Sequence, residues 1–476
     1  MIYLFYSKLQ TGVLLKGRKM MKIISSIPKE DLYFKEDFVR MEKVSSETEG
    51  NIINVYDDVL YQEVLGFGGA FTEASAYNYS LMDSETKKEF IKAYFDKEKG
   101  IGYSFGRTHI NSCDFSLDMY TYVAEGDETL ESFSIARDEK YIIPFIKDAL
   151  DVAGEELLLF ASPWSPPAYM KDNKSMLEGG KLLPQYKKLW ALYYARYIKA
   201  YRNHGIKISA ISVQNEPKAK QSWESCYYTA EDERELIENY LIPVFDEEGL
   251  TDIKIIIWDH NKERVYDRAK EVLSSERVKN RVWAVGHHWY SGDHYEALSL
   301  VERELKKPNI CTEFCASMRM TSDLLALAER YAREFCENMN NYCTGICDWN
   351  LLLDSKGGPY HHRFKPGTDA LDYDYKEMGA GCYSPVMFNE EEKTFERTPV
   401  YYYIGHFSKY IKRGAKRIAT TKYTGDIYAT AFLNPDGEKV LVIMNPADEG
   451  KDAVVRNNGE CTKFNLRPHS IVTVLF

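Results

Sequence analysis

The feature that most constrains the fold of this chain is an alternation, from about residue 62 onward, of short apolar runs with longer stretches patterned for helices. This alternation is typical of βα units around a parallel sheet. Eight runs qualify as strands: Val64–Phe71, Tyr103–Ile110, Leu157–Ser162, Ile208–Val213, Lys254–Trp258, Val282–His288, Asn309–Phe314 and Gly345–Leu352. Eight parallel strands with intervening helices predict an α/β protein with a closed (β/α)8 TIM barrel.

The stretches between these runs have the period of amphipathic helices. In residues 186–203 and 322–338, apolar residues recur three and four positions apart, which places them on one face of a helix. We expect such helices to form the outer ring of the barrel. The glycine-rich stretch Gly66–Ala70 lacks the Lys and Ser/Thr of a phosphate loop, so its expected purpose is tight packing at the first strand.

A separate β module is predicted at the C-terminal end. The turn residues Asn434-Pro435-Asp436-Gly437 separate two apolar runs, as in a β-hairpin. Residues 471–476 fit a closing strand, and residues 21–60 form short strand-like runs that we expect to pack with this module. The predicted divisions are an extension without fixed structure at 1–20, N-terminal strands at 21–60, the barrel at 61–414 and the C-terminal module at 415–476.

Charge limits the class of partner. The chain carries 61 Lys and Arg against 72 Asp and Glu, a formal net charge of −11, and a field of that sign repels phosphate backbones and anionic membranes. We therefore expect a neutral substrate and no nucleic-acid partner. No apolar run approaches the roughly 18 residues of a transmembrane segment. Residues 1–22 lack the apolar core of a secretion signal, so we expect a cytoplasmic location.

Nine cysteines occur at scattered positions. Cys311/Cys315 and Cys343/Cys347 form CxxxC pairs, but each lies in an apolar, strand-like run without a histidine at zinc-finger spacing. We interpret them as free buried thiols. The sequence therefore predicts a protein that needs neither a metal nor an organic cofactor.

Two glutamates follow predicted strands on roughly opposite sides of the barrel. The fourth run continues into Asn215-Glu216-Pro217, and the seventh ends at Thr312-Glu313-Phe314. Catalytic groups of TIM barrels lie at the C-terminal ends of the strands, and hydrolysis of a glycosidic bond needs one carboxylic acid and one carboxylate. Either glutamate taken alone is explained equally well as the ion-pair partner of an Arg or Lys and as a catalytic group. Together, Glu216 and Glu313 favour a catalytic pair.

Polar and aromatic residues follow the other strands as well. Aromatic faces suit the C–H surfaces of a sugar, and amides, carboxylates and imidazoles suit its hydroxyl groups. Two of these residues, His287 and Trp289, fit a buried core role equally well. The set comprises Arg107, Asp114, Trp164, His287, His288, Trp289, Tyr290, Asp348, Trp349 and Asn350.

Several motifs together resemble glycoside hydrolase family 30, most closely its glucosylceramidase-like branch. The resemblance covers about residues 60–476, in the expected order. It implies a (β/α)8 barrel joined to a β-sandwich built from both chain ends, and a retaining mechanism. The motifs are Gly66-Phe67-Gly68-Gly69-Ala70-Phe71-Thr72-Glu73, Ser112-Cys113-Asp114-Phe115-Ser116, Ala161-Ser162-Pro163-Trp164, Asn215-Glu216-Pro217, His288-Trp289-Tyr290, Asp348-Trp349-Asn350 and Gly405-His406-Phe407-Ser408-Lys409.

The resemblance also implies roles for single residues. It makes Glu216 the general acid/base and Glu313 the nucleophile, and it has Asn215 hold the sugar 2-hydroxyl. In a retaining site the two carboxyl groups lie about 5 to 5.5 Å apart, and we expect the charged neighbour to raise the pKa of the acid towards roughly 6 or 7. The expected sugar contacts are Arg107, Asp114, Trp164, Asn215, Tyr290 and Trp349, with His288 and Asn350 added from their positions at strand ends.

The chain departs from secreted animal members of the family, because it has no evident signal peptide and no N-terminal disulfide cluster. This argues against a lysosomal or extracellular ceramide substrate. The loop 354–397, which we expect to shape the aglycone side, does not align clearly with the family.

Our interpretation is a retaining, exo-acting β-glycosidase that cleaves β-glucosides from short oligosaccharides or glycoconjugates. Within the enzyme class the alternatives are an endo-β-1,6-glucanase and a β-xylosidase or β-fucosidase on the same scaffold. A transglycosylase with the same covalent intermediate also stays open. From another class, the alternative is a catalytically silent carbohydrate-binding barrel, against which the presence of both glutamates argues.

Overall fold

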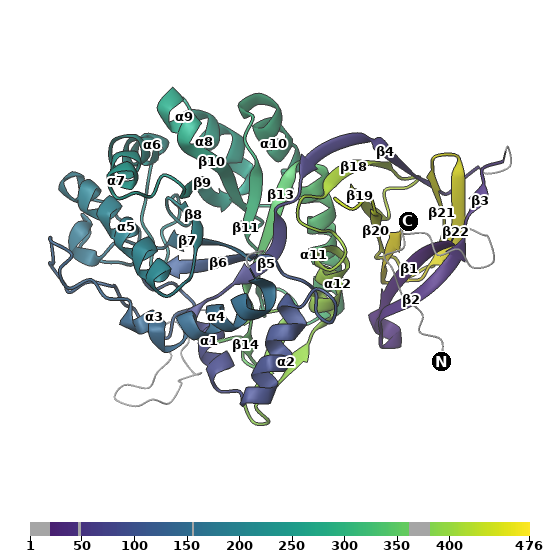
Figure 1. The fold of residues 1–476 in the computed structure, drawn as a ribbon, viewed down its shortest axis with the longest axis horizontal. Helices are drawn as coiled ribbons and strands as arrows, with labels where there is room; N and C mark the ends of the chain where they lie inside the picture. The colour runs from purple at the N-terminus through teal and green to yellow at the C-terminus, as the bar shows by residue number, and fades with distance from the viewer. Residues whose placement is uncertain (1–19, 46–48, 155–156, 361–380) are drawn as a thin grey trace, which may run out of the picture. The chain divides into compact units, whose positions relative to one another are not determined.

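A computed structural model describes residues 20–45, 49–154, 157–360 and 381–476, which form two compact units (Figure 1). One unit comprises the described parts of Phe67–Ser322 and Asn341–Arg397. The other comprises the described parts of Met1–Gly66 together with Asp323–Asn340 and Thr398–Phe476. The predicted extension at 1–20 lies outside the described residues, apart from Met20, which begins the first strand.

The larger unit contains a closed barrel of eight parallel strands in the order β10-β11-β13-β5-β6-β7-β8-β9. The predicted fold class is therefore confirmed. The bounds differ mainly at the fifth strand, which continues past Trp258, and at the eighth, which begins before Gly345. The strands are β5 (Gly66–Ala70), β6 (Phe105–Ile110), β7 (Leu158–Pro163), β8 (Ile208–Ser212), β9 (Lys254–Asn261), β10 (Val282–His288), β11 (Asn309–Glu313) and β13 (Cys343–Asn350).

Close packing of backbones explains the glycines of the first barrel strand. A Cβ atom on Gly68 would lie 1.4 Å from the carbonyl oxygen of Phe105, on the neighbouring strand β6. No side chain fits that space. The expectation that Gly66–Ala70 serves tight packing is confirmed.

Helices surround the barrel strands in Figure 1. The predicted helix at 186–203 is α5, in which Trp190, Tyr194, Ile198 and Tyr201 form part of a buried face. Among the described residues, no helix combines the length and the apolar character that crossing a membrane requires. The helices of this unit are α1 (Glu73–Ser80), α2 (Ser84–Phe95), α3 (Ala136–Lys140), α4 (Ile142–Ala153), α5 (Lys187–Asn203), α6 (Ala230–Leu236), α7 (Ile242–Glu247), α8 (Val265–Val272), α9 (Glu276–Arg281) and α10 (Tyr295–Leu300).

Ten strands of the smaller unit form one sheet, in the order β2-β1-β23-β20-β19-β18-β4-β21-β22-β3. The predicted hairpin is β19–β20, whose turn has Gly437 at φ +88° and a hydrogen bond from its N–H to Asn434. The strands are β1 (Met20–Ile27), β2 (Leu32–Arg40), β3 (Glu42–Lys43), β4 (Ile52–Glu63), β18 (Lys416–Thr421), β19 (Tyr428–Leu433), β20 (Lys439–Asn445), β21 (Lys451–Asn457), β22 (Glu460–Leu466) and β23 (Ser470–Leu475).

N-terminal and C-terminal strands share this sheet and its core. Strand β23 pairs with β1 on one side and β20 on the other, and β4 lies between β18 and β21. Ile23, Ile53, Ile443 and Val472 belong to the same buried cluster. Among its described residues this unit has two α-helices, α11 (Leu324–Asn340), which corresponds to the predicted helix at 322–338, and α12 (Pro399–Ser408).

Short strands follow the seventh and eighth barrel strands. Strand β12 (Ala316–Ser317) pairs with β15 (Cys382–Tyr383), and β14 (Leu353–Asp354), β16 (Val386–Asn389) and β17 (Thr394–Arg397) form a small sheet. The loop predicted to shape the aglycone side, 354–397, therefore contains strands, but its residues 361–380 lie outside the described part of the chain.

Candidate active site

The two predicted catalytic glutamates lie at the C-terminal ends of β8 and β11. Glu216 follows β8 in a left-handed conformation with φ +46°, and its N–H donates to the carbonyl oxygen of Asp259 at 3.0 Å. Glu313 is the last residue of β11. A left-handed conformation is uncommon for a residue other than glycine and is concentrated at functional sites. Both side chains are largely buried, with residue exposures of 9% for Glu216 and 7% for Glu313.

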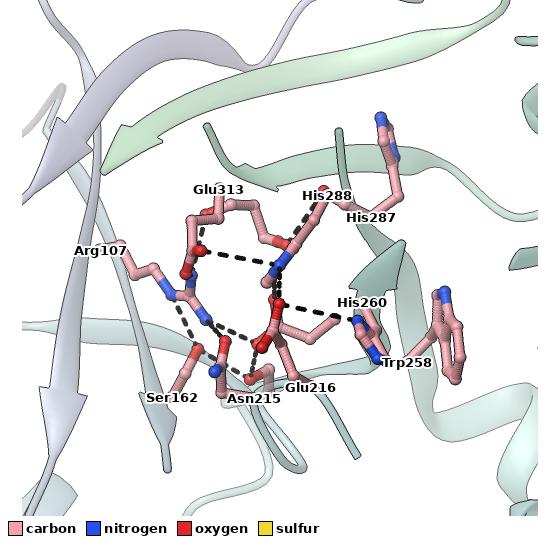
Figure 2. A network of polar contacts seen from close by, with 12 residues as sticks. Arg107, Ser162, Asn215, Glu216, Trp258, His260, His287, His288 and Glu313 are labelled. Atoms are coloured by element: carbon pink, nitrogen blue, oxygen red, sulfur yellow. Dashed lines mark hydrogen bonds and ion pairs between the residues drawn. The ribbon is translucent and has the colours of Figure 1, made fainter. Parts of the chain in front are cut away.

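Arg107, from β6, organises the site (Figure 2). Its Nη1 donates to Oε2 of Glu313 at 2.7 Å, and its Nη2 donates to Oδ1 of Asn215 at 2.9 Å and Oδ2 of Asp259 at 2.8 Å. Burial disfavours the guanidinium charge, but Asp259 and Glu313 outweigh it and raise the pKa of Arg107. The planar, permanently charged donor therefore fixes the positions of a carboxylate and an amide at the mouth of the barrel.

Glu313 has a second donor. The hydroxyl of Tyr290 donates to its Oε1 at 2.7 Å. The pKa of Glu313 is raised, chiefly by burial and also by Glu216, although His288, Arg107 and the Tyr290 hydrogen bond act to lower it. The two donors orient the carboxylate, and both stabilise its ionised form.

Glu216 is surrounded by imidazoles and an amide. Nδ1 of His288 lies 3.3 Å from its Oε1, Nδ1 of His260 lies 3.7 Å from the same oxygen, and Gln221 donates to its Oε2 at 3.2 Å. Burial would raise the pKa of Glu216, but His288 and His260 outweigh it and lower the pKa below its usual range. The expectation of a raised pKa for the acid is therefore wrong for the free site, because it omitted these two histidines.

One imidazole contacts both candidate catalytic carboxylates. Nδ1 of His288 lies 3.7 Å from Oε1 of Glu313 and 3.3 Å from Oε1 of Glu216. The distance between these two carboxylate oxygens therefore cannot exceed the sum of the two values. Nε2 of His288 lies 3.0 Å from Asp259. Burial disfavours the imidazolium, but Glu313, Asp259 and Glu216 outweigh it and raise the pKa of His288 to about 9. The ring is therefore cationic at neutral pH.

A cavity of about 350 Å³ adjoins both carboxylates. The rings of Trp164 and Trp349 stack with centroids 5.0 Å apart, and both line the cavity. The lining comprises Asp114, Phe115, Trp164, Asn215, Glu216, Gln221, Trp223, His260, Asn261, Tyr290, Glu313, Cys315, Ser317, Met320, Trp349 and Cys382.

The structure places most of the predicted sugar contacts at this cavity. Asp114 also stands out, because its Oδ1 is buried without a hydrogen-bond partner among the described residues, and burial together with Glu313 raises its pKa well above the usual range. Arg107 and His288 lie behind the carboxylates with no exposed surface. Asn350 is not among the lining residues and instead accepts a hydrogen bond from Thr72.

The sequence left open whether Trp289 and His287 contact the sugar or belong to the core. Trp289 is 1% exposed, stacks on Phe314 and donates to the carbonyl oxygen of Cys315, which fits the core role. His287 is also fully buried. The nine cysteines are free thiols, eight of them buried, as expected, although Cys315 and Cys382 reach the cavity lining.

Asp259, His260 and Gln221 are site residues that the sequence analysis missed. Asp259 and His260 lie near the C-terminal end of β9, so the rule used for the other strands would have found them had the fifth strand not been ended at Trp258. Gln221 lies in the loop after β8, without such a signal. Among the described residues, Glu216, His260 and His288 form a group with ligating atoms within 4.8 Å of one another.

Comparison with known proteins gives two family matches. Residues 64–411 match the glycosyl hydrolase family 30 TIM-barrel domain, and residues 414–474 match the glycosyl hydrolase family 30 beta sandwich domain. The lysosomal acid glucosylceramidase of Mus musculus is 30% identical over 420 residues, covering 84% of this chain and 78% of the relative.

Solved structures agree with these matches over nearly the whole chain. SrfJ from Salmonella typhimurium is 32% identical with a TM-score of 0.89, and the alignment covers 96% of this chain and 99% of SrfJ. An endo-β-1,6-glucanase is 27% identical with a TM-score of 0.82, again covering 96% of this chain and 99% of that one.

Proposed function

Because this chain belongs to glycoside hydrolase family 30, and is therefore a glycosidase, we propose that it is a retaining, exo-acting β-glucosidase of the glucosylceramidase-like kind. Glu313 is the nucleophile and Glu216 the general acid/base. The observation that supports this most directly is the pair of buried carboxylates at one cavity, where Arg107 and Tyr290 hold Glu313 and His288 contacts both Glu313 and Glu216.

The contacts support the division of roles. Arg107 and Tyr290 hold Glu313 in position and stabilise its ionised form, as attack on the anomeric carbon requires. Taken alone, the lowered pKa of Glu216 and the raised pKa of Glu313 would favour the opposite assignment. However, His288 is protonated at neutral pH and its Nδ1 lies 3.3 Å from Glu216, so these two groups hold one proton between them.

In the first step, Glu313 attacks the anomeric carbon while the leaving oxygen takes the proton held by Glu216 and His288. Bond formation consumes the negative charge of Glu313 and leaves a covalent glycosyl ester. In the second step, Glu216 removes a proton from water, which attacks the anomeric carbon on the face opposite the ester bond; that bond breaks and the Glu313 carboxylate is released. Two inversions give net retention.

Two observations support a terminal neutral sugar as the substrate. The cavity volume of about 350 Å³ lies near the lower end of the range for small-molecule sites, and the net charge of −11 favours an uncharged ligand. Trp164 and Trp349 stack on each other and, although each is only 2% exposed, both line the cavity, where aromatic side chains suit a sugar ring. The glucosylceramidase relative supports glucose as that sugar.

An endo-β-1,6-glucanase is the second candidate, because a solved structure so named resembles this chain over most of its length. Release of the aglycone from a panel of nitrophenyl β-glycosides (glucose, xylose, fucose and galactose), beside product analysis on a β-1,6-linked glucan, separates the two activities. Monosaccharide release is expected. Long oligosaccharides without monosaccharide would instead support the endo-acting enzyme.

Azide rescue tests the roles of the glutamates. In Glu313→Gly, azide is expected to attack an activated β-glucoside directly, and one inversion gives the α-glucosyl azide. In Glu216→Ala, the substrate still glycosylates Glu313, and azide then releases the β-glucosyl azide after two inversions. NMR of the anomeric proton distinguishes the products. Exchanged configurations would reverse the roles, and no rescue in either variant would support a silent carbohydrate-binding barrel.

A further inference from the structure

A buried nitrogen without a partner lies beside Glu216. Nδ1 of His260 makes no hydrogen bond within the described part of the chain, although it lies 3.7 Å from Oε1 of Glu216. Both side chains are 12% exposed. A buried polar atom without a hydrogen-bond partner destabilises the folded protein by about 1–3 kcal/mol. A ligand that accepts the lone pair of this nitrogen would remove that penalty.

His288 presents a second imidazole to the same oxygen. Its Nδ1 lies 3.3 Å from Oε1 of Glu216, while its Nε2 lies 3.0 Å from Oδ1 of Asp259. A carboxylate behind an imidazole fixes the orientation of the ring and increases the basicity of the nitrogen that faces a metal. Asp259 therefore holds His288 as a metal-ligating histidine is held. Figure 2 shows Glu216 facing both rings.

The three side chains have the composition and spacing of a zinc site. Their ligating atoms lie within 4.8 Å of one another, and a tetrahedral zinc ion with bonds of about 2.0–2.1 Å holds its ligand atoms roughly 3.4 Å apart. The separations of 3.3 and 3.7 Å from Oε1 of Glu216 are close to that value. Two imidazoles and one carboxylate, with a further position open, form a ligand set that zinc uses in proteins.

Access and charge also favour a cation. Glu216 and His260 line the cavity, so an ion reaches them from solvent and water completes its coordination. The adjoining network contains two further carboxylates, Asp259 and Glu313, against the single guanidinium of Arg107. With Arg107 and the cationic His288 counted against the carboxylates of Glu216, Asp259 and Glu313, the cluster still carries net negative charge. Zinc binding replaces the proton on Nδ1 of His288, which is released to solvent.

We propose that a divalent cation of the zinc type binds to Glu216, His260 and His288 and reversibly inhibits the enzyme. Coordination through Glu216 blocks exchange of a proton with the leaving oxygen or with water. The inhibitory part of this proposal rests on the acid/base role proposed above, whereas the binding part does not.

Binding is tested first, on the full chain after removal of metals with a chelator. Calorimetric titration with Zn²⁺ is expected to show one site per chain, and Co²⁺ as a probe is expected to give visible absorption bands without a thiolate charge-transfer band. Glu216→Gln, which keeps the shape of the side chain, and His260→Ala are each expected to weaken binding by on the order of 100-fold or more. Thermal unfolding verifies that each variant is folded.

Two control variants locate the ion. Cys382→Ser removes a thiol from the lining of the same cavity, and His204→Ala removes a histidine that contacts Glu139 elsewhere. Both are expected to bind zinc as the unmodified chain does. A thiolate band that disappears in Cys382→Ser, or unchanged binding in both Glu216→Gln and His260→Ala, would overturn the site.

Inhibition is measured separately with a nitrophenyl β-glucoside. Activity is expected to fall as the site fills and to return when chelator is added. His260→Ala, compared with its own uninhibited rate, is expected to resist zinc by the same factor by which its binding is weakened. Zinc that binds at this site without inhibiting an active enzyme would overturn the inhibitory role. Zinc binding to an enzyme that is inactive on the β-glucoside would instead count against the proposed β-glucosidase function.

Discussion

Removal of one hydroxyl, in Tyr290→Phe, tests whether Glu313 must be ionised to act. The hydroxyl donates to Oε1 of Glu313 at 2.7 Å and lowers the pKa of that carboxyl group. A hydrogen bond to a charged group contributes about 1.5–3 kcal/mol. Because Tyr290 is 41% exposed, water replaces part of this bond, so we take the lower value of about 1.5 kcal/mol. That corresponds to a rise of about one unit in the pKa of Glu313.

The sign of the pH effect follows from the role of Glu313. A nucleophile acts in its ionised form, so a higher pKa moves the acidic limb of the kcat/KM profile to higher pH by about one unit. On that limb kcat/KM falls about tenfold, while the alkaline limb stays where it was. Steady-state kinetics from pH 4 to 9 measure both limbs, and Tyr56→Phe, on an exposed tyrosine of β4, is the control. An unchanged acidic limb in a folded Tyr290→Phe enzyme would refute the reasoning.

Three further changes test other parts of the structure. Trp349→Ala is expected to lower kcat/KM by about 2–3 kcal/mol of transition-state binding, because the sugar loses a stacking surface; normal activity per folded molecule would make Trp349 a core residue only. Exhaustive chelation and mild reducing agent are expected to leave full activity, and loss that zinc restores would contradict this. His406 contacts Ser26 and Thr473 at 2.8 Å, and burial lowers its pKa to about 3. In the unfolded chain this imidazole gains a proton below about pH 6.5. The free energy of unfolding therefore decreases as the pH is lowered, by about 2 kcal/mol between pH 7 and pH 5. Urea unfolding at pH 7 and 5 should show a smaller loss for His406→Gln, and equal losses would contradict the assignment.

The barrel was predictable from the sequence because its strands are continuous apolar runs separated by helical periods. The positions of the two candidate catalytic glutamates were predictable because Glu216 comes shortly after one such run and Glu313 lies at the end of another. The end of the fifth strand was not, since Trp258 and Asp259 continue it in left-handed conformations, with φ of +72° and +52°, that leave no mark on composition. The prediction therefore stopped before the carboxylate that holds His288.

Neighbouring residues on one strand limited the site prediction in a second way. Trp349 and Asn350 end β13, and successive side chains of a strand face opposite sides. The structure has Trp349 at the cavity and Asn350 against Thr72. The pKa of Glu216 depends on His260 and His288, which come from other strands. The direction of its pKa shift therefore depends on distances across the barrel, which cannot be read from the spacing of residues along the sequence.

The position of β23 inside the ten-stranded sheet has a consequence for biosynthesis. Strands β1, β2 and β4 leave the ribosome before any barrel helix, whereas β23, the partner of β1, leaves after all of them. During translation of the barrel, β1 therefore has its β2 hairpin partner but presents its other edge unpaired. The nascent chain must keep that edge from associating with other molecules until the last strand arrives. A premature stop that removes only β23 would leave both β1 and β20 with open edges, so we expect such short truncations to aggregate rather than fold.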